Sequence, residues 1–460
     1  MIKPILEQEF KPAIIEIRNF FSDVASQAEK THLIIALERD NGYTYVREFD
    51  VFKEGVDDKR NTFIVERFIK TLLWVVGGYK VYIYGSKKIY EDIKSYYQLG
   101  GLREFDFNFM STVYETKFEV IYVDNILDMP KERKCSLPMG GFLDGNRVGF
   151  DAGGSDIKIS SVVNGEVIHS EEILWLPKLN EDISYHYEHI YNAMKKAIDI
   201  MGGKCDGIGV STAGVIINNK PMVSSLFIKV DKQYFKQVKQ VYINTVNRLS
   251  EELGHEIPFV VANDGDVTAL AGAIDLKDNS VLGIAMGTSE AVGYVDPHGN
   301  LTGYLNELAF APVDFNLDAM VDEWSGDFGV GCKYFSQDAV IKLAEYGGFK
   351  FEDGLTPAQK LKVIQALMAK DDPLAAQIYE DIGVYLAHTI PFYAKFYDIK
   401  HMLLLGRVMG GKGGDVILAT CKETLAAEYP EFATLDIGLP DEKNRRVGQS
   451  IAAASLPATK

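Results

Sequence analysis

Two hairpins of similar design carry the residues of this sequence that are best suited to contact phosphate. Each hairpin consists of an apolar strand, a turn of glycine and hydroxyl residues, and a second strand. The turn residues are Gly153, Gly154 and Ser155 in the first hairpin, and Gly287, Thr288 and Ser289 in the second. A glycine backbone lets N–H groups approach a phosphate closely. The duplication therefore predicts two phosphate-binding turns that face each other, whereas either turn alone is also consistent with an ordinary glycine turn.

Two aspartates stand at the ends of predicted strands. Asp151 ends the first strand of the first hairpin, and Asn263-Asp264 lies where a later strand stops and a helix begins. The second position is exposed and has backbone N–H donors nearby. Each aspartate also has an ordinary explanation, since Asp151 can be a turn carboxylate and Asp264 can be a helix N-cap. Asp266 is the better candidate for that cap.

Strands and helices alternate around these residues. Helices are predicted over about 183–201 and 232–253, and each leads into a buried strand. In the mostly helical C-terminal third, the strand 401–405 runs into a glycine turn that contains Gly410 and Gly411, and a helix follows. A glycine turn before a helix N-terminus suits a nucleoside or a phosphate, and it is equally consistent with a plain turn. The alternation predicts an α/β fold.

The first 127 residues are predicted to form an α/β domain of their own. A hairpin that turns near residues 40–42 is followed by a helix over 62–76, a strand over 80–84, a helix over 88–98 and a strand over 118–123. This domain has no glycine-rich phosphate loop, so its role is not predicted. Because it also opens with a hairpin, one hypothesis is that it is a degenerate copy of the half-fold that follows. Residues 128–146, with several prolines and glycines, are predicted to be a linker.

Composition limits the classes of partner. The chain of 460 residues has 47% hydrophobic and 25% charged residues, as expected for a globular protein of two or three domains. A net charge of −17 argues against nucleic acid or an anionic membrane as partner. No signal peptide and no membrane-spanning run are found, so a cytoplasmic location is expected. The dispersed cysteines, which are Cys135, Cys205, Cys332 and Cys421, predict neither a zinc site nor disulfides.

Residues 147–455 resemble the actin-like (ribonuclease H-like) two-lobed ATPase fold and, within it, the ROK family of sugar kinases. Asp151-Ala-Gly-Gly-Ser-Asp-Ile-Lys158 resembles the family's Asp-x-Gly-Gly-Thr-x-x-Lys hairpin, and Asn263-Asp264 matches its Asn-Asp pair. Gly287-Thr-Ser289 resembles the second phosphate turn. Asn306-Glu-Leu-Ala-Phe310 is similar to Gly-Glu-x-Gly-His, and Gly410-Gly411 is similar to the adenosine loop. The five matches occur in the family's order.

The resemblance implies ATP-dependent transfer of a phosphoryl group to a hydroxyl of a sugar or sugar derivative. It makes Asp264 the general base and Asp151 the residue that holds Mg²⁺, with ATP between the glycine turns. The implied sugar-binding residues are Asn263, Glu307 and Thr212. From their residue types alone, Glu307 can equally be a surface residue and Thr212 a turn hydroxyl.

The resemblance also implies a first lobe over 147–270 and a second lobe over 271–460, and it allows for a homodimer. Small-molecule sugar and nucleotide are the expected partners. Lys158 of the first hairpin is expected to be solvated or structural.

Four departures from the family pattern stand out. Glu290 follows the second glycine turn, where a carboxylate would repel a triphosphate. Phe310 replaces a histidine, Tyr334 replaces a glutamate, and Cys332 is the one cysteine left in the family's zinc stretch. Zinc is therefore not expected. The departures motivate an alternative function, a sugar- or nucleotide-binding sensor or scaffold that has lost turnover.

Overall fold

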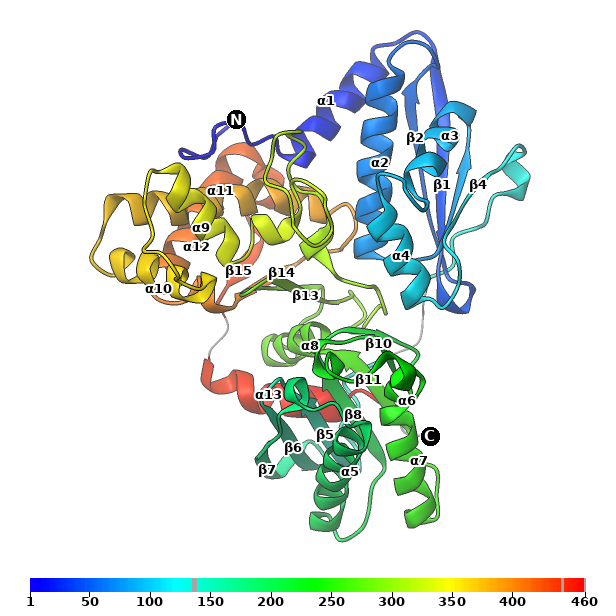
Figure 1. Cartoon of the computed structure of the whole chain (residues 1–460), viewed down its shortest axis with the longest axis vertical. Helices are drawn as coiled ribbons and strands as arrows, with labels where there is room; N and C mark the ends of the chain where they lie inside the picture. The colour runs from blue at the N-terminus through cyan, green and yellow to red at the C-terminus, as the bar shows by residue number, and fades with distance from the viewer. Residues whose placement is uncertain (135–138, 440–441, 459–460) are drawn as a thin grey trace.

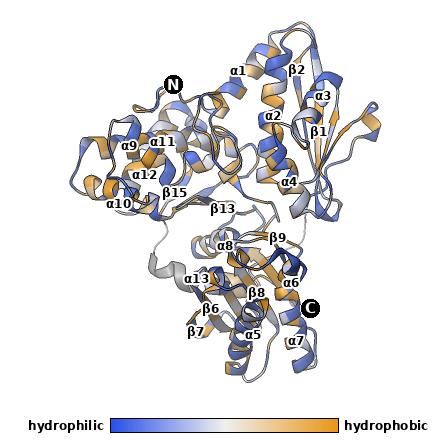
Figure 2. Ribbon diagram, in the orientation of Figure 1, coloured by the Kyte–Doolittle hydropathy of each residue, from blue (hydrophilic) through white to orange (hydrophobic). Residues whose placement is uncertain are grey.

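The computed structural model describes residues 1–134, 139–439 and 442–458. Within them the chain forms one five-stranded sheet, two four-stranded sheets and a two-stranded ribbon. Figure 1 shows three parts, with the N-terminal sheet and the helical C-terminal part above a third part that carries β5 to β8. Helices at the outside of the molecule carry both hydrophilic and hydrophobic residues (Figure 2). The prediction for Cys135 lies outside the described residues.

The N-terminal sheet has the strand order β2-β1-β3-β4. Its strands are β1 (Lys30–Glu38), β2 (Thr44–Phe52), β3 (Lys80–Tyr84) and β4 (Glu119–Tyr122), and its helices are α2 (Asp58–Val75), α3 (Lys87–Tyr96) and α4 (Glu104–Val113). Strand β1 runs antiparallel to both β2 and β3. In each of the two lobes described next, the first strand of the hairpin is antiparallel to its hairpin partner and parallel to the strand on its other side. The N-terminal sheet is therefore not a copy of their topology, and that hypothesis is wrong.

The first lobe is built on the five-stranded sheet, with the order β11-β8-β5-β6-β7. Its strands are β5 (Asn146–Ala152), β6 (Asp156–Val163), β7 (Glu166–Leu174), β8 (Gly207–Thr212) and β11 (Phe259–Asn263). Strands β5, β6 and β7 form an antiparallel meander, while β8 is parallel to β5 and to β11. Helices α5 (Ile183–Ile200), α6 (Phe235–Lys239) and α7 (Val241–Leu253) belong to this part. The helix predicted over 232–253 is thus interrupted at Gln240.

The second lobe holds the four-stranded sheet β13-β12-β14-β15. Its strands are β12 (Val281–Met286), β13 (Glu290–Val295), β14 (His401–Leu405) and β15 (Asp436–Gly438). Its helices are α9 (Gln337–Tyr346), α10 (Pro357–Met368), α11 (Pro373–Tyr393) and α12 (Lys412–Glu428), and α8 (Asp264–Leu276) connects it to the first lobe. The hairpin β12–β13 repeats the design of β5–β6, because its first strand is again parallel to a later strand.

Both ends of the chain cross the predicted domain boundaries. Helix α13 (Glu442–Ala454) packs on the first-lobe sheet (Figure 1), so the prediction that all of 271–460 forms the second lobe is wrong at its end. The contact is so close that a Cβ on Gly209 would lie 1.6 Å from the carbonyl oxygen of Ala453. Similarly, the backbone N–H groups of Ile5 and Leu6 donate to Asp381 of α11. The first residues therefore pack on the second lobe rather than on the N-terminal sheet.

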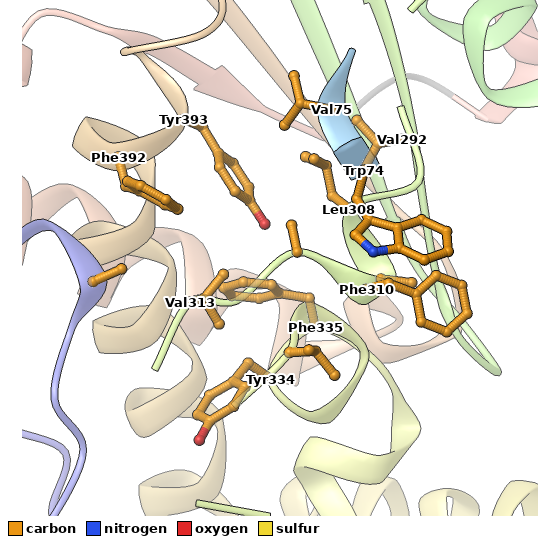
Figure 3. Packing of buried hydrophobic residues seen from close by; sticks show 14 of the residues in the cluster. Trp74, Val75, Val292, Leu308, Phe310, Val313, Tyr334, Phe335, Phe392 and Tyr393 are labelled. Atoms are coloured by element: carbon orange, nitrogen blue, oxygen red, sulfur yellow. The ribbon is translucent and has the colours of Figure 1, made fainter. Parts of the chain in front are cut away.

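The N-terminal sheet and the second lobe share one continuous hydrophobic core. Trp74 of α2 lies against Phe310 of the second lobe, with ring centroids 4.5 Å apart (Figure 3). Beside them, Arg67 of α2 is fully buried and pairs with Asp327 of the second lobe at 3.0 Å. Burying charged groups costs free energy unless each charge is paired with an opposite one. None of the helices in the described part of the chain is long and apolar enough to cross a membrane.

Candidate functional site

A cavity of about 220 Å³, here called the cleft cavity, lies between the two lobes. The first lobe contributes the end of β5 and the turn after it, and the second lobe contributes residues of its sheet. Helix α8 lies between them and contributes its N-terminus. The lining includes Asp151, Gly153, Gly154, Lys178, Asp264, Thr268, Ala285 and Ala291. The cleft cavity thus joins the first glycine turn, the strand-end aspartates and the second hairpin.

Asp151 is held at the end of β5 by two neighbouring strands. Its Oδ1 accepts a hydrogen bond of 2.7 Å from the hydroxyl of Ser211, and Lys158 Nζ lies 3.8 Å from its Oδ2. Burial raises the pKa of Asp151, and the bond from Ser211 and the charge of Lys158 oppose that rise. Lys158 also lies 3.8 Å from Asp156, so its ammonium group faces the site and offsets two carboxylates.

The end of β11 places Asp264 in the cleft cavity. Asn263 is the N-cap of α8, because its Oδ1 accepts from the N–H of Gly265 at 2.7 Å while its Nδ2 donates to the carbonyl of Gly214. The cap expected at Asp266 is therefore wrong, since Asp266 is buried and accepts from Tyr294 N–H and Asn306 Nδ2. Asp264 is left accessible. Its pKa is raised by desolvation and by the charge of Asp151, which suits a proton acceptor.

Two glycines fix the N-terminus of α8 against the second hairpin. A Cβ on Gly293 of β13 would lie 2.0 Å from the carbonyl oxygen of Gly265, and a Cβ on Gly265 would lie 2.5 Å from that of Val292. No side chain fits at either position without a shift of the backbone. The close approach therefore sets the position of Asp264 relative to β13.

Glu307 lies close enough to α8 to interact with its aspartates. Desolvation raises the pKa of Glu307 to about 7, and repulsion from Asp264 and Asp266 adds to the rise. Its backbone N–H donates to the carbonyl of Trp74 at the end of α2. Glu307 is half-buried beside the aspartates of α8, which keeps it a candidate for contacting a ligand.

Other predicted residues lie apart from the cleft cavity. Thr212 is buried and accepts a hydrogen bond of 3.0 Å from Tyr242, so it is not a pocket residue. Ser155 stands at an exposed turn and donates to Asp156. Thr288 and Ser289 are exposed, and Gly287 makes backbone contacts with Ser289 and with the start of α9. Gly410 and Gly411 line a separate depression beside Tyr379.

Lys178 is a cavity residue that the sequence did not indicate. It lies in a short turn, Pro177–Leu179, after β7, and its Cε and Nζ are 3.4 Å from the place that a Cβ on Gly154 would occupy. Nearby, the Trp175 indole donates to the carbonyl of Gly153 at 2.8 Å and ties this turn to the glycine turn. Lys178 follows the glycines by more than twenty residues in an irregular segment. No local pattern could have linked them.

The departures from the family pattern lie outside the cleft cavity. The side chain of Glu290 is only 4% exposed, and strand alternation turns the neighbouring Ala291 toward the cavity instead. The expected repulsion of a triphosphate by Glu290 therefore does not arise. Phe310 packs on Trp74, and Tyr334 donates to Asp314 at 2.6 Å. Among the described residues, no three His, Cys, Asp or Glu side chains are grouped so as to hold a metal ion.

Comparisons with known proteins identify the fold. A ROK hexokinase from Thermus thermophilus is 16% identical, with a TM-score of 0.50 over 67% of this chain and 97% of that chain. A ROK family glucokinase from Streptomyces griseus, solved with glucose and AMPPNP, is 16% identical, with a TM-score of 0.45 over 67% and 98%. A ROK family transcriptional regulator, a homologue of the E. coli MLC protein, is 14% identical, with a TM-score of 0.49 over 68% and 78%.

No family model matches the chain, and no curated protein matches it significantly. The likeness is thus visible in the arrangement of the elements and not in the overall sequence. Each of the two lobes opens with a hairpin whose first strand is parallel to a later one. The predicted α/β, actin-like fold is confirmed: the chain has the two-lobed fold of the ROK sugar kinases.

Proposed function

We propose that this protein transfers the γ-phosphoryl group of ATP to a hydroxyl of a sugar or sugar derivative. The observation that carries the proposal is the cleft cavity, where Asp264 and the glycine turn of Gly153 and Gly154 line one space. A phosphate donor and a proton acceptor are needed in the same place for this reaction. The two-lobed kinase fold supports the same function.

The residues divide into three roles. Asp264 accepts the proton of the sugar hydroxyl as its oxygen attacks the γ-phosphorus, and the bond from that phosphorus to the β,γ-bridging oxygen breaks to release ADP. Glu307 and Asn263 hold the sugar. The backbone N–H of Gly154 contacts the phosphates, while that of Gly153 donates to the carbonyl of Asp156 and shapes the turn. Lys178 supplies positive charge beside them. Closure of the lobes excludes water.

Asp151 is the candidate ligand for Mg²⁺. Its carboxylate suits a hard cation, and a single carboxylate with water and phosphate oxygens is a usual environment for Mg²⁺ in kinases. When bound, Mg²⁺ neutralises phosphate charge. The hydrogen bond from Ser211 fixes the carboxylate, so Asp151 is pre-oriented for this role.

A coupled assay of ADP release over a panel of sugars tests the proposal. At least one sugar is expected to stimulate release, and Asp264→Asn is expected to lower kcat by about 100-fold or more, as for loss of a general base. Asp275→Asn is the matched control, because Asp275 is exposed at the other end of α8. Stimulated release that survives Asp264→Asn would contradict the assignment of the base.

A second candidate is a sensor or scaffold that binds ligand without turnover. The observation that favours it is the packing of Phe310 against Trp74. The resemblance implies a sugar-binding histidine at this position. Calorimetry separates the candidates when combined with the assay. Binding of ATP or a sugar without ADP release from any sugar would establish the second candidate and end the first.

A further inference from the structure

Strand β4 forms an open edge of the N-terminal sheet. On one side it runs parallel to β3, and the N–H of Val123 donates to the carbonyl of Ile83 at 2.9 Å. Because backbone groups alternate along a strand, the N–H and C=O groups of Val120 and Tyr122 point to the other side, away from β3. No residue in the described part of the chain pairs with these groups. They are therefore available to a further strand.

A groove of about 800 Å³ runs along this open edge. It is lined by Tyr90 and Lys94 of α3, by Leu99 of the loop after α3, and by all of β4. The Tyr122 ring lies 5.3 Å from that of Tyr90, so strand alternation turns Ile121 to the opposite face of the sheet. Figure 1 shows β4 on the side of the sheet that points away from the second lobe. A strand can thus reach β4 without displacing either lobe.

The other edges of the three larger sheets are protected in the ways usual for soluble proteins. On β11, the Asn219 amide donates to one backbone carbonyl and accepts from one backbone N–H. On β13, Gly265 of α8 covers the edge, and on β2 the end of the strand pairs with Arg133. Strand β7 carries Glu171 and Glu172, and β15 has only three residues. Among the described edges, β4 is the one left open.

The two ends of β4 carry opposite charges. Lys117 precedes the strand and Asp124 follows it, and both are exposed residues that line the groove. Neither forms an ion pair with a described residue. A strand laid antiparallel along β4 is therefore favoured when it has an acidic end near Lys117 and a basic end near Asp124. A second β4 strand has this pattern.

Exposed apolar side chains follow the same rule. Leu99 is 68% exposed and lies near the start of β4, because the Tyr97 ring packs 5.5 Å from that of Phe118. Leu127 is 85% exposed and comes just after the end of the strand. When two β4 strands run antiparallel, the start of one lies beside the end of the other. This arrangement brings Leu99 of each copy toward Leu127 of the other copy and removes apolar surface from water.

We propose that β4 is a docking edge for a second copy of this chain, with two β4 strands paired antiparallel about a two-fold axis at Ile121. Val120 of each copy lies opposite Tyr122 of the other, and the pair exchanges backbone hydrogen bonds. The same surface serves both copies, as in an isologous dimer. The two four-stranded sheets become one sheet of eight strands. The inference does not depend on phosphoryl transfer.

Sedimentation velocity of the full chain between about 1 and about 100 µM tests the pairing, because its extent depends on concentration. The wild type is expected to form a dimer at the upper end. Ile121→Lys places two like charges opposite each other on the axis and is expected to raise the dimer Kd at least about tenfold. Ile168→Lys is the matched control, because Ile168 is an exposed apolar residue on the edge strand β7. Far-UV circular dichroism checks that the variants fold.

A cysteine on the axis gives a second measurement. Antiparallel residues that do not share hydrogen bonds have Cα atoms about 4.5 Å apart, which a disulfide can span. Ile121→Cys is therefore expected to form a covalent dimer under mild oxidation, faster than the wild type or Ile168→Cys.

The inference is overturned if the wild type stays monomeric at about 100 µM, or if Ile121→Lys leaves the dimer unchanged. If Ile121→Lys fails to fold, the rate of cross-linking in Ile121→Cys decides: a rate no higher than that of Ile168→Cys overturns the inference, and a higher rate supports it. Absence of ADP release refutes the kinase proposal alone.

Discussion

Replacing Glu290 with glutamine is expected to stabilise the protein at neutral and alkaline pH. Glu290 is 4% exposed, and its buried carboxylate lies beside the Tyr393 hydroxyl, which lowers its pKa but does not offset the cost of burial. Burial in the shared core raises its pKa to about 8 from an ordinary value of 4.5, and repulsion from Glu307 contributes. The native protein therefore keeps a proton on Glu290 that the unfolded chain loses.

The size of the effect follows from proton linkage. Below pH 4.5 both the native and the unfolded chain carry the proton on Glu290, so this group does not lower the free energy of unfolding. That free energy falls as the pH rises toward about 8. In that interval the free energy of unfolding decreases by about 1.4 kcal/mol per pH unit. By pH 7.5 the titration of Glu290 has lowered the free energy of unfolding by about 4 kcal/mol. Glutamine has nearly the same shape and no proton to lose, so Glu290→Gln restores most of that amount.

Urea unfolding at pH 5, 6, 7 and 7.5 measures the difference between the two proteins. The variant is expected to match the wild type near pH 5 and to gain about 1.4 kcal/mol for each further pH unit. Other buried acids titrate in both proteins and cancel. Glu166→Gln, at an exposed position of β7, is the control and should change stability by less than about 0.5 kcal/mol at every pH. A difference that does not vary with pH would refute the reasoning.

Three further predictions concern the phosphate site, the docking of the N-terminal sheet and the position of α8. Lys178→Ala is expected to raise the Kd for ATP about tenfold in a fluorescent-nucleotide competition assay, with Lys204→Ala unchanged, because a charge-assisted phosphate contact is lost. Arg67→Met is expected to cost about 3–5 kcal/mol in urea unfolding, since Arg103 and Lys70 then remain to balance the buried carboxylates of Glu66, Asp106 and Asp327, whereas Lys53→Met removes an exposed ion pair and costs under about 1 kcal/mol. Gly293→Ala is expected to lower both thermal stability and kcat, because its Cβ would lie 2.0 Å from the backbone of α8, and normal values of both would refute that packing argument.

The part of the site that follows from local sequence could be predicted. Asp151 and its glycine turn are consecutive, and Asn263-Asp264 stands at a strand end, so strand and turn patterns place both. The choice of N-cap could not be made in this way. Asn263 and Asp266 are both good caps, and the N–H of Tyr294, far away in sequence, removes Asp266 from the competition. A hydrogen bond between residues distant in sequence thus holds Asp266 in the interior, while Asp264 lines the cleft cavity.

Tertiary packing also explains one of the elements that the sequence did not indicate. Helix α4 (Glu104–Val113) contains Phe105, Phe107 and Phe109, an alternation that is more typical of a strand than of a helix. In the structure Phe105 and Phe109 both pack on Trp74, and Phe107 turns to Phe118 of the N-terminal sheet. One helix thus packs on two sides into the same shared core. Its aromatic residues surround much of its circumference, and the usual one-sided pattern is absent.

The docking of the N-terminal sheet gives a physical reason for the departures from the ROK pattern. Phe310 contacts Trp74, so a polar histidine at this position would be buried in an aromatic cluster at a cost in free energy. The adjoining Glu307 is fixed from the same side, because its N–H bonds to the carbonyl of Trp74 at the end of α2. In this chain the N-terminal part thus holds the segment of Glu307 and Phe310 through Trp74. It follows that the sheet belongs to the architecture of the candidate site, and that loss of its contacts would displace Glu307 from Asp264.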